Sequence, residues 1–148
     1  MKRVFLLAAL ILFVATSALY AHFAMDTSLA DSDASFIGEA ENDTAGGCVS
    51  NVGDINGDGY DDFAVVSLPN GTYAGQTYLF FGKASGWAMD TNVADADASF
   101  IGEAGGDYSG NSVSALGDVN GDGFNDFIIG APNNDEAVSY THLRAHET

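Results

Sequence analysis

The stretch Gly53–Asp62, GDINGDGYDD, places four acidic residues and three glycines in ten consecutive positions. It returns further along the chain as GDVNGDGFND, at Gly117–Asp126. Asn-Gly and Asp-Gly steps mark tight turns, and crowded carboxylates repel one another. We therefore expect two acidic turns whose carboxylates surround a cation.

The two acidic stretches belong to a longer internal repeat. Residues 24–63 align with residues 88–127 without a gap, and 26 of these 40 positions are identical. The period of the repeat is 64 residues, the offset from Gly53 to Gly117. Self-similarity at a fixed period of this length indicates an array of similar structural units.

Each repeat contains short β-like runs and no sustained amphipathic helical pattern. Runs of β-branched and aromatic residues between turn residues predict four strands, at Val49–Val52, Phe63–Val66, Thr77–Phe81 and Ala98–Ile101, the last matching Ala34–Ile37 in the preceding copy. Four short strands per unit predict an all-β fold of β-propeller blades. A β-solenoid is the alternative, but its rungs normally repeat at a shorter interval.

The segment Asp107–Pro132, DYSGNSVSALGDVNGDGFNDFIIGAP, resembles the FG-GAP repeat of integrin alpha-chain propellers and their bacterial relatives. Gly130-Ala131-Pro132 corresponds to the GAP ending, while Ser109-Gly110 stands where the family has FG. The first copy departs further, with Ala45-Gly46 at the FG position and Ser67-Leu68-Pro69 in place of GAP. These departures weaken any inference of closeness to integrins and leave the blade assignment standing.

The resemblance implies about one and a half blades of a larger ring. It covers roughly residues 23–137, and we expect a first blade at residues 22–86 and an incomplete second blade at residues 87–137. Because propeller blades cover one another's faces, this piece alone is expected to be marginally stable.

Each acidic loop carries oxygen-bearing side chains at positions 1, 3, 5 and 9, and glycine at position 6 permits a sharp turn that aims the position 7 carbonyl inward. Calcium takes about six to eight hard oxygen ligands, which such a loop and water can supply. We predict about one calcium per repeat, two in this chain. The predicted ligands are Asp54, Asn56, Asp58, the Tyr60 carbonyl and Asp62 in the first loop, and Asp118, Asn120, Asp122, the Phe124 carbonyl and Asp126 in the second.

Other metal loops fit the pattern less well. An EF-hand or dockerin loop needs an acidic residue at position 12, where this chain has Val65 and Ile129, and a helix after the loop. Magnesium prefers a tight octahedron, and zinc prefers Cys or His, neither of which recurs in the repeat. The remaining alternative is an acidic hairpin turn that binds no metal.

Charge narrows the expected partners. Residues 22–137 contain 20 acidic side chains and the single basic residue Lys83, a formal charge of −19. Such a surface repels nucleic acid and anionic membranes and favours cations. The lone Cys48 corresponds to Ser112 in the second copy, so no internal disulfide is expected. With no nucleophile–base pair or phosphate loop in the sequence, we expect this chain not to be an enzyme.

Both ends of the chain differ from the repeats. Lys2 and Arg3 precede an apolar run, Val4–Val14, and then small residues, which predicts a signal peptide at residues 1–21 with cleavage between Ser17 and Ala21. An uncleaved membrane anchor is the alternative, although it would need nearer 20 apolar residues. No other membrane contact is expected, and export predicts a secreted or cell-surface protein.

The last residues, Val138–Thr148, read VSYTHLRAHET and resemble one translated reading frame of a transposase adapter used in sequencing libraries. We interpret residues 138–148 as adapter read-through that carries no function. The alternative is a genuine strand, Val138–Thr141, followed by a polar tail.

The resemblance implies an extracellular calcium-binding propeller module for adhesion or ligand recognition, in which calcium is structural and the partner is a protein or a glycan. An accessory propeller of a secreted hydrolase or lyase, whose catalytic domain lies beyond this fragment, is the alternative. A surface-layer or matrix protein with many more repeats is a third possibility.

Overall fold

The computed structural model describes residues 32–68, 72–134 and 140–142, the last three by backbone alone. The predicted signal peptide, residues 1–21, and residues 143–148 lie outside the described part. The chain divides into two compact units, residues 1–33 and 34–148, and every described strand lies in the second. Within the described ranges no helix is long and apolar enough to cross a membrane.

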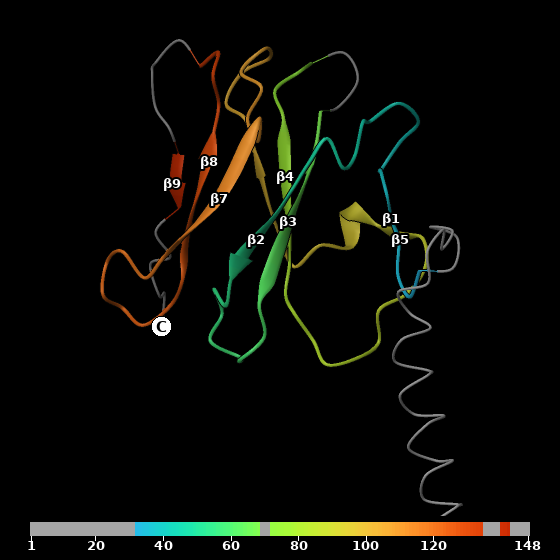
Figure 1. Ribbon diagram of the computed structural model, residues 1–148. Coiled ribbons are helices and arrows are strands. Elements are labelled where there is room, and N and C mark those ends of the chain that lie inside the picture. The colour runs from blue at the N-terminus through green and yellow to red at the C-terminus, as the bar shows by residue number, and fades with distance from the viewer. Residues whose placement is uncertain (1–31, 69–71, 135–139, 143–148) are drawn as a thin grey trace, which may run out of the picture. The chain divides into compact units, whose positions relative to one another are not determined.

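The described strands form three sheets (Figure 1). The largest is an antiparallel meander in the order β2 (Cys48–Gly53), β3 (Asp62–Ser67), β4 (Gln76–Phe80) and β6 (Ala98–Ile101). A second sheet contains β7 (Ser112–Gly117), β8 (Asp126–Gly130) and β9 (Tyr140–His142), and a third pairs β1 (Phe36–Ile37) with β5 (Thr91–Asn92) in parallel. A short 3-10 turn, η2 (Val93–Asp95), follows β5.

This architecture confirms the all-β prediction. The four-stranded meander is a propeller blade, and β7, β8 and β9 are part of a second one. Parallel rungs, which a β-solenoid would need, do not build these two antiparallel sheets. The predicted strands are present, with β4 starting one residue earlier than expected and β1 limited to Phe36–Ile37.

The blade takes strands from both predicted repeat segments. Its first three strands precede residue 86, whereas β6 follows it. The four-stranded blade therefore begins and ends at different positions from the predicted repeat segments. The division between residues 86 and 87 stays a prediction about the sequence repeat.

Each acidic stretch forms the tip of an antiparallel hairpin with the same register in both copies. Cys48 pairs with Val66, and one period later Ser112 pairs with Gly130. A bulge follows in each hairpin, between Asn51 and Gly53 in the first copy. A bulge twists a strand and re-aims the residues beyond it, which here begin the acidic loops.

The first blade buries apolar side chains on both faces, because successive residues of a strand point to opposite sides. Ala64 and Leu79 belong to a core cluster that includes Phe127 of the second blade. Their neighbours Val65 and Tyr78 belong to a second cluster on the other face. The blade is therefore an interior layer with a neighbour on each side.

A pair of phenylalanine rings repeats at both sides of the blade. Phe36 meets Phe63 edge to face with ring centroids 5.4 Å apart. One period later, Phe100 meets Phe127 with the same geometry at 5.6 Å. Each ring pair joins a strand to the strand one layer further along the chain, so the sequence repeat is also a repeat of packing.

The short strand β9 pairs with the free side of β8 and places His142 opposite Phe127, the position that Phe80 takes opposite Phe63 in the first blade. Main-chain hydrogen bonds at an open sheet edge do not depend on side-chain identity, so a segment of any origin can pair there. The read-through interpretation of residues 138–148 stays a prediction.

The close approach of two loop backbones predicts that alanine substitution destabilises the fold more at one glycine than at another. Gly75 has φ +84°, and a side chain there would meet the Ser109 backbone, with its nitrogen at 2.6 Å. Gly86 has φ +86° with open space around it. We expect Gly75→Ala to lower the free energy of unfolding by about 3 kcal/mol or more, and Gly86→Ala by about 1–2 kcal/mol. Urea unfolding measures both, and equal losses would contradict the close packing.

Candidate metal centre

The two candidate metal loops lie at the hairpin tips, residues 54–61 between β2 and β3 and residues 118–125 between β7 and β8. The strands therefore position each loop rigidly at its two ends. The residues between fold through hydrogen bonds to their own side chains.

The first aspartate of each loop is the centre of its turn. One carboxylate oxygen of Asp54, Oδ1, accepts N–H bonds from Gly57 at 2.7 Å and Asp58 at 3.1 Å, and Oδ2 accepts from Gly59 at 2.9 Å. Asp118 accepts the corresponding three bonds at the same three distances. A carboxylate thus turns the backbone around itself in both copies.

The side chains at positions 3 and 5 join the same network. The Asp58 N–H, which already reaches Asp54, also donates to Asn56 Oδ1 at 2.9 Å. Asn56 Nδ2 in turn donates to Asp58 Oδ2 at 2.8 Å. Oxygens from positions 1 and 3 therefore share one donor, and position 5 lies within hydrogen-bonding reach of position 3. The second loop repeats these contacts at Asn120 and Asp122.

The aspartate at position 9 closes the base of each loop. Asp62 is 1% exposed, and its two oxygens accept N–H bonds from Ile55 at 2.9 Å and Gly82 at 2.7 Å. Asp126 is equally buried and accepts from Val119 at 2.9 Å. These bonds tie the loop to the sheet, a role that the sequence did not indicate because Gly82 is 20 residues away.

Burial raises the pKa of Asp62 above its ordinary value of 3.8, and the charges of Asp58 and Asp54 raise the pKa further, against the two backbone hydrogen bonds. A carboxyl group with a raised pKa binds its proton more readily in the folded protein, so ionisation destabilises the fold as pH rises through this window. A cation beside these carboxylates would oppose that effect.

In the part of the chain that the structure describes, no group of three or more His, Cys, Asp or Glu side chains is arranged to hold a metal ion. In the first loop, the predicted metal ligands include the Asn56 amide oxygen and the Tyr60 carbonyl oxygen. The carboxylate of Asp62 accepts hydrogen bonds from backbone N–H groups. Every candidate ligand atom is nevertheless an oxygen. Oδ2 of Asp54 and both carboxylate oxygens of Asp62 each accept one N–H bond and keep further lone pairs. This chemistry fits a hard cation such as calcium, and the ligand roles stay predictions.

The two loops touch each other. The Asn125 N–H donates to the Asp54 carbonyl at 3.2 Å. A Cβ at Gly57 would lie 2.6 Å from the Phe124 ring, so that ring rests against the first loop's backbone. Sequence reasoning missed this contact, because the repeat period says nothing about the distance between copies in space. No residue pattern marks this contact, because the equivalent Gly121 is also a glycine although no described atom lies within 4 Å of a Cβ built there.

Comparison with known proteins gives consistent matches. A sequence model of the FG-GAP repeat matches residues 50–80 and 109–142, which include both acidic loops. Integrin alpha-PS3 of Drosophila melanogaster is 36% identical over 108 residues, 70% of this chain and 9% of the relative. Integrin alpha-PS5 of the same species is 37% identical over 108 residues, 70% of this chain and 10% of the relative. Integrin alpha-4 of Xenopus laevis is 31% identical over 93 residues, 63% of this chain and 9% of the relative. The chain therefore spans about a tenth of the length of the curated relatives it matches.

The closing role of Asp62 can be tested without metal. In buffer with a chelator, we expect Asp62→Ala to lower the free energy of unfolding by about 2–4 kcal/mol, because two backbone N–H groups lose their acceptor. The control is Asp61→Ala. The exposed Asp61 carboxylate accepts a hydrogen bond from the Asn51 side chain at 3.2 Å, and we expect a change within about 0.5 kcal/mol. Similar effects in a urea titration would contradict the assigned role.

Proposed function

Since this chain is an FG-GAP repeat protein, we propose that it is part of an extracellular propeller module that recognises a protein or glycan ligand and holds one structural calcium ion in each acidic loop. The proposed ligand set is the one predicted from the sequence. Asp54, Asn56, Asp58, Asp62 and the Tyr60 carbonyl serve the first loop, and the residues one period later serve the second.

The observation that carries the calcium proposal is the retention of every proposed side-chain ligand in two loops that differ at Ile55, Tyr60 and Asp61. Ile55 and Tyr60 become Val119 and Phe124, while every proposed side-chain ligand is identical. The hydrogen bonds around Asp54 and Asp118 also agree in partner and distance. The same set of oxygen donors in both copies supports one cation in each loop.

Calcium would supply positive charge beside the carboxylates of each loop. The chain's own residues do the rest: Asp54 folds the turn, Asp62 anchors it to the sheet, and Gly59 allows the backbone bend. Extracellular calcium modules bind with dissociation constants of about 0.1–1 mM. At about 1 mM calcium and a dissociation constant near 0.1 mM, each site would stabilise the fold by about 1.4 kcal/mol.

Recognition of a ligand and a place outside the cell are proposed from the relatives, which are integrin alpha chains. We propose no catalytic role for this chain, in keeping with those relatives. The full reading frame of the gene tests the assignment: further blades alone support a recognition module, whereas a hydrolase or lyase domain would make the propeller an accessory of an enzyme.

Calcium titration of the full chain tests the ligand assignment. We expect about two calcium ions per chain by calorimetry, and a rise in the thermal unfolding midpoint with calcium but much less with magnesium. Asp58→Ala and Asp122→Ala should each remove one site. Asp61→Asn is the matched control, because the second loop already has Asn125 there, and it should keep both sites. Two sites in the Asp58→Ala variant would refute the ligand set, and no binding at 10 mM calcium (about 100 times the expected dissociation constant) would refute the calcium proposal.

Contact between the loops predicts that Phe124 influences calcium binding at the first loop. With the second site removed by Asp122→Ala, we expect Phe124→Ala to weaken calcium binding at the first loop about fivefold, because the ring supports the Gly57 backbone. Tyr60 holds the same position in the first loop and is 46% exposed. As control, Tyr60→Ala in the Asp58→Ala background should leave the second site's affinity unchanged. An unchanged first site in the Phe124→Ala variant would exclude the coupling.

A further inference from the structure

Each acidic loop contains an Asn-Gly step, Asn56-Gly57 in the first copy and Asn120-Gly121 in the second. Such a step is prone to form a cyclic imide, because glycine has no Cβ to keep its nitrogen away from the asparagine side chain. A third step in the sequence, Asn70-Gly71, lies outside the described residues. The two loops therefore place the same chemistry in two different surroundings.

The reaction is an internal substitution followed by hydrolysis. The glycine nitrogen loses its proton to a base from solvent and attacks the side-chain carbonyl carbon, Cγ, of the asparagine. A bond forms between this nitrogen and Cγ, the bond from Cγ to Nδ2 breaks, and Nδ2 takes up a proton and leaves as ammonia. Water then opens the imide at either carbonyl carbon, which leaves aspartate or isoaspartate.

The folded loops hold the reacting groups in place. The Gly57 N–H donates to Asp54 Oδ1 at 2.7 Å. Both polar atoms of the Asn56 side chain bond to Asp58, Nδ2 to its carboxylate and Oδ1 to its N–H. The second loop makes the equivalent bonds one period later. Because the nitrogen must lose its proton and the side chain must turn before attack, imide formation requires local opening of the loop.

Contacts with the neighbouring loop hold the first loop closed. A Cβ at Gly57 would lie 2.6 Å from the Phe124 ring, whereas no described atom lies within 4 Å of a Cβ built at Gly121. The Asp54 carbonyl also accepts the Asn125 N–H at 3.2 Å. Opening the first loop must therefore disturb a ring contact and a hydrogen bond in addition to the bonds within the loop.

Exposure and internal bonds differ in the same direction. Asn56 is half-buried and Asn120 is exposed. The bond from Nδ2 to the position 5 aspartate measures 2.8 Å in the first loop and 3.1 Å in the second. Asn120 Nδ2 has one further contact, to Asp126 Oδ1, but at 3.5 Å it is long for a hydrogen bond. The second loop is therefore the easier of the two to open.

We infer that Asn120 is a site of spontaneous modification in the folded chain, converted to aspartate or isoaspartate through an imide with Gly121, and that loop packing protects Asn56. Either product adds a carboxylate between Asp118 and Asp122. Isoaspartate also lengthens the backbone by a methylene group, which shifts the N–H groups that Asp118 Oδ1 accepts. The modification therefore loosens the second turn, and this inference does not depend on calcium.

Peptide mapping of the full chain by mass spectrometry tests the inference. The folded chain is kept in mildly alkaline buffer with a chelator, and deamidation is followed separately at each asparagine. We expect Asn120 to react about tenfold faster than Asn56, because opening the first loop breaks an additional hydrogen bond and a ring contact. In concentrated urea the two rates should agree within about twofold, since the preceding residues, Ile55 and Val119, are both β-branched.

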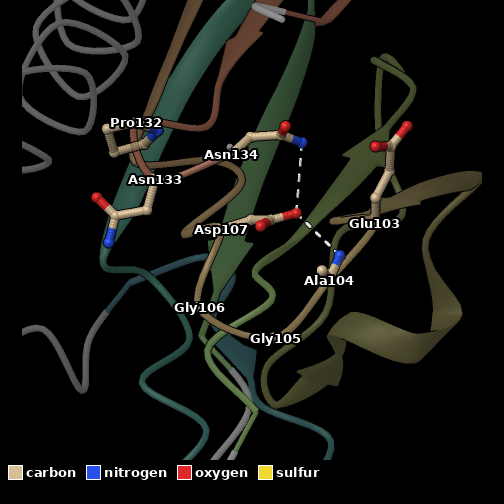
Figure 2. Close-up of a pocket in the computed structure, with 8 residues that line it drawn as sticks. All are labelled: Glu103, Ala104, Gly105, Gly106, Asp107, Pro132, Asn133 and Asn134. Atoms are coloured by element: carbon tan, nitrogen blue, oxygen red, sulfur yellow. Dashed lines mark hydrogen bonds between the residues drawn. The ribbon is translucent and has the colours of Figure 1, made fainter. Parts of the chain in front are cut away.

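Asn133 separates the effect of exposure from that of the following glycine. It is exposed, and its side chain points away from Asp107 in Figure 2, whereas Asn134 Nδ2 contacts Asp107 at 3.5 Å. The residue after Asn133 carries a Cβ, which crowds the attacking nitrogen. We expect Asn133 to react at least about tenfold more slowly than Asn120 in the folded chain and in urea.

Two variants locate the protection. Phe124→Ala removes the ring from Gly57 and should raise the rate at Asn56 about threefold or more. Asp118→Asn weakens the hydrogen bond to the Gly121 N–H and should raise the rate at Asn120 about threefold or more, while an unchanged rate at Asn56 shows that the rest of the chain stays folded.

The comparison within the unmodified sequence decides the inference even if a variant fails to fold. Equal rates at Asn56 and Asn120 in the folded chain would overturn it. A difference that persists in urea would also overturn it, because the cause would then be the local sequence. An Asn120 that reacts in urea but stays intact in the folded chain would show that both loops are protected, which contradicts the inferred site.

Discussion

A carboxylate that accepts backbone N–H bonds from its own loop sets the geometry of both hairpins. Asp54 and Asp118 each bind three donors that would otherwise need water. Because the loop is closed around this side chain, the strands on either side enter at one register, and the bulge after Asn51 recurs one period later. The pairing of β2 with β3 and of β7 with β8 follows from that constraint.

The same arrangement concentrates negative charge that the chain cannot neutralise. The only basic residue between residues 22 and 137 is Lys83, and its ammonium group lies 4.3 Å from the centre of the Trp87 ring. Burial and neighbouring carboxylates raise the pKa of Asp62, because they disfavour its ionised form. Charge balance at the loops must therefore come from solution, which is the physical reason for proposing a cation.

The hairpins were predictable from the sequence because their signals are local. Runs such as Phe63–Val66, together with the period of the repeat, locate the strands to within one or two positions and place both loops at hairpin tips. Contacts between distant segments were not predictable. The bond from Gly82 to Asp62 and the parallel pairing of β1 with β5 depend on how the layers stack, and no local pattern encodes that stacking.

Burial in this protein is a property of position in the stack more than of residue type. Ile55 is buried and Val119 exposed, yet at position 7 the order reverses, with Tyr60 exposed and Phe124 half-buried. Each loop thus presents one side to the preceding layer and the other to the next. Such a contact is head to tail, since the two surfaces that meet are different. An array built this way leaves an unmatched surface at each end unless it closes into a ring, so the apolar residues of one repeat are explained only by its neighbours.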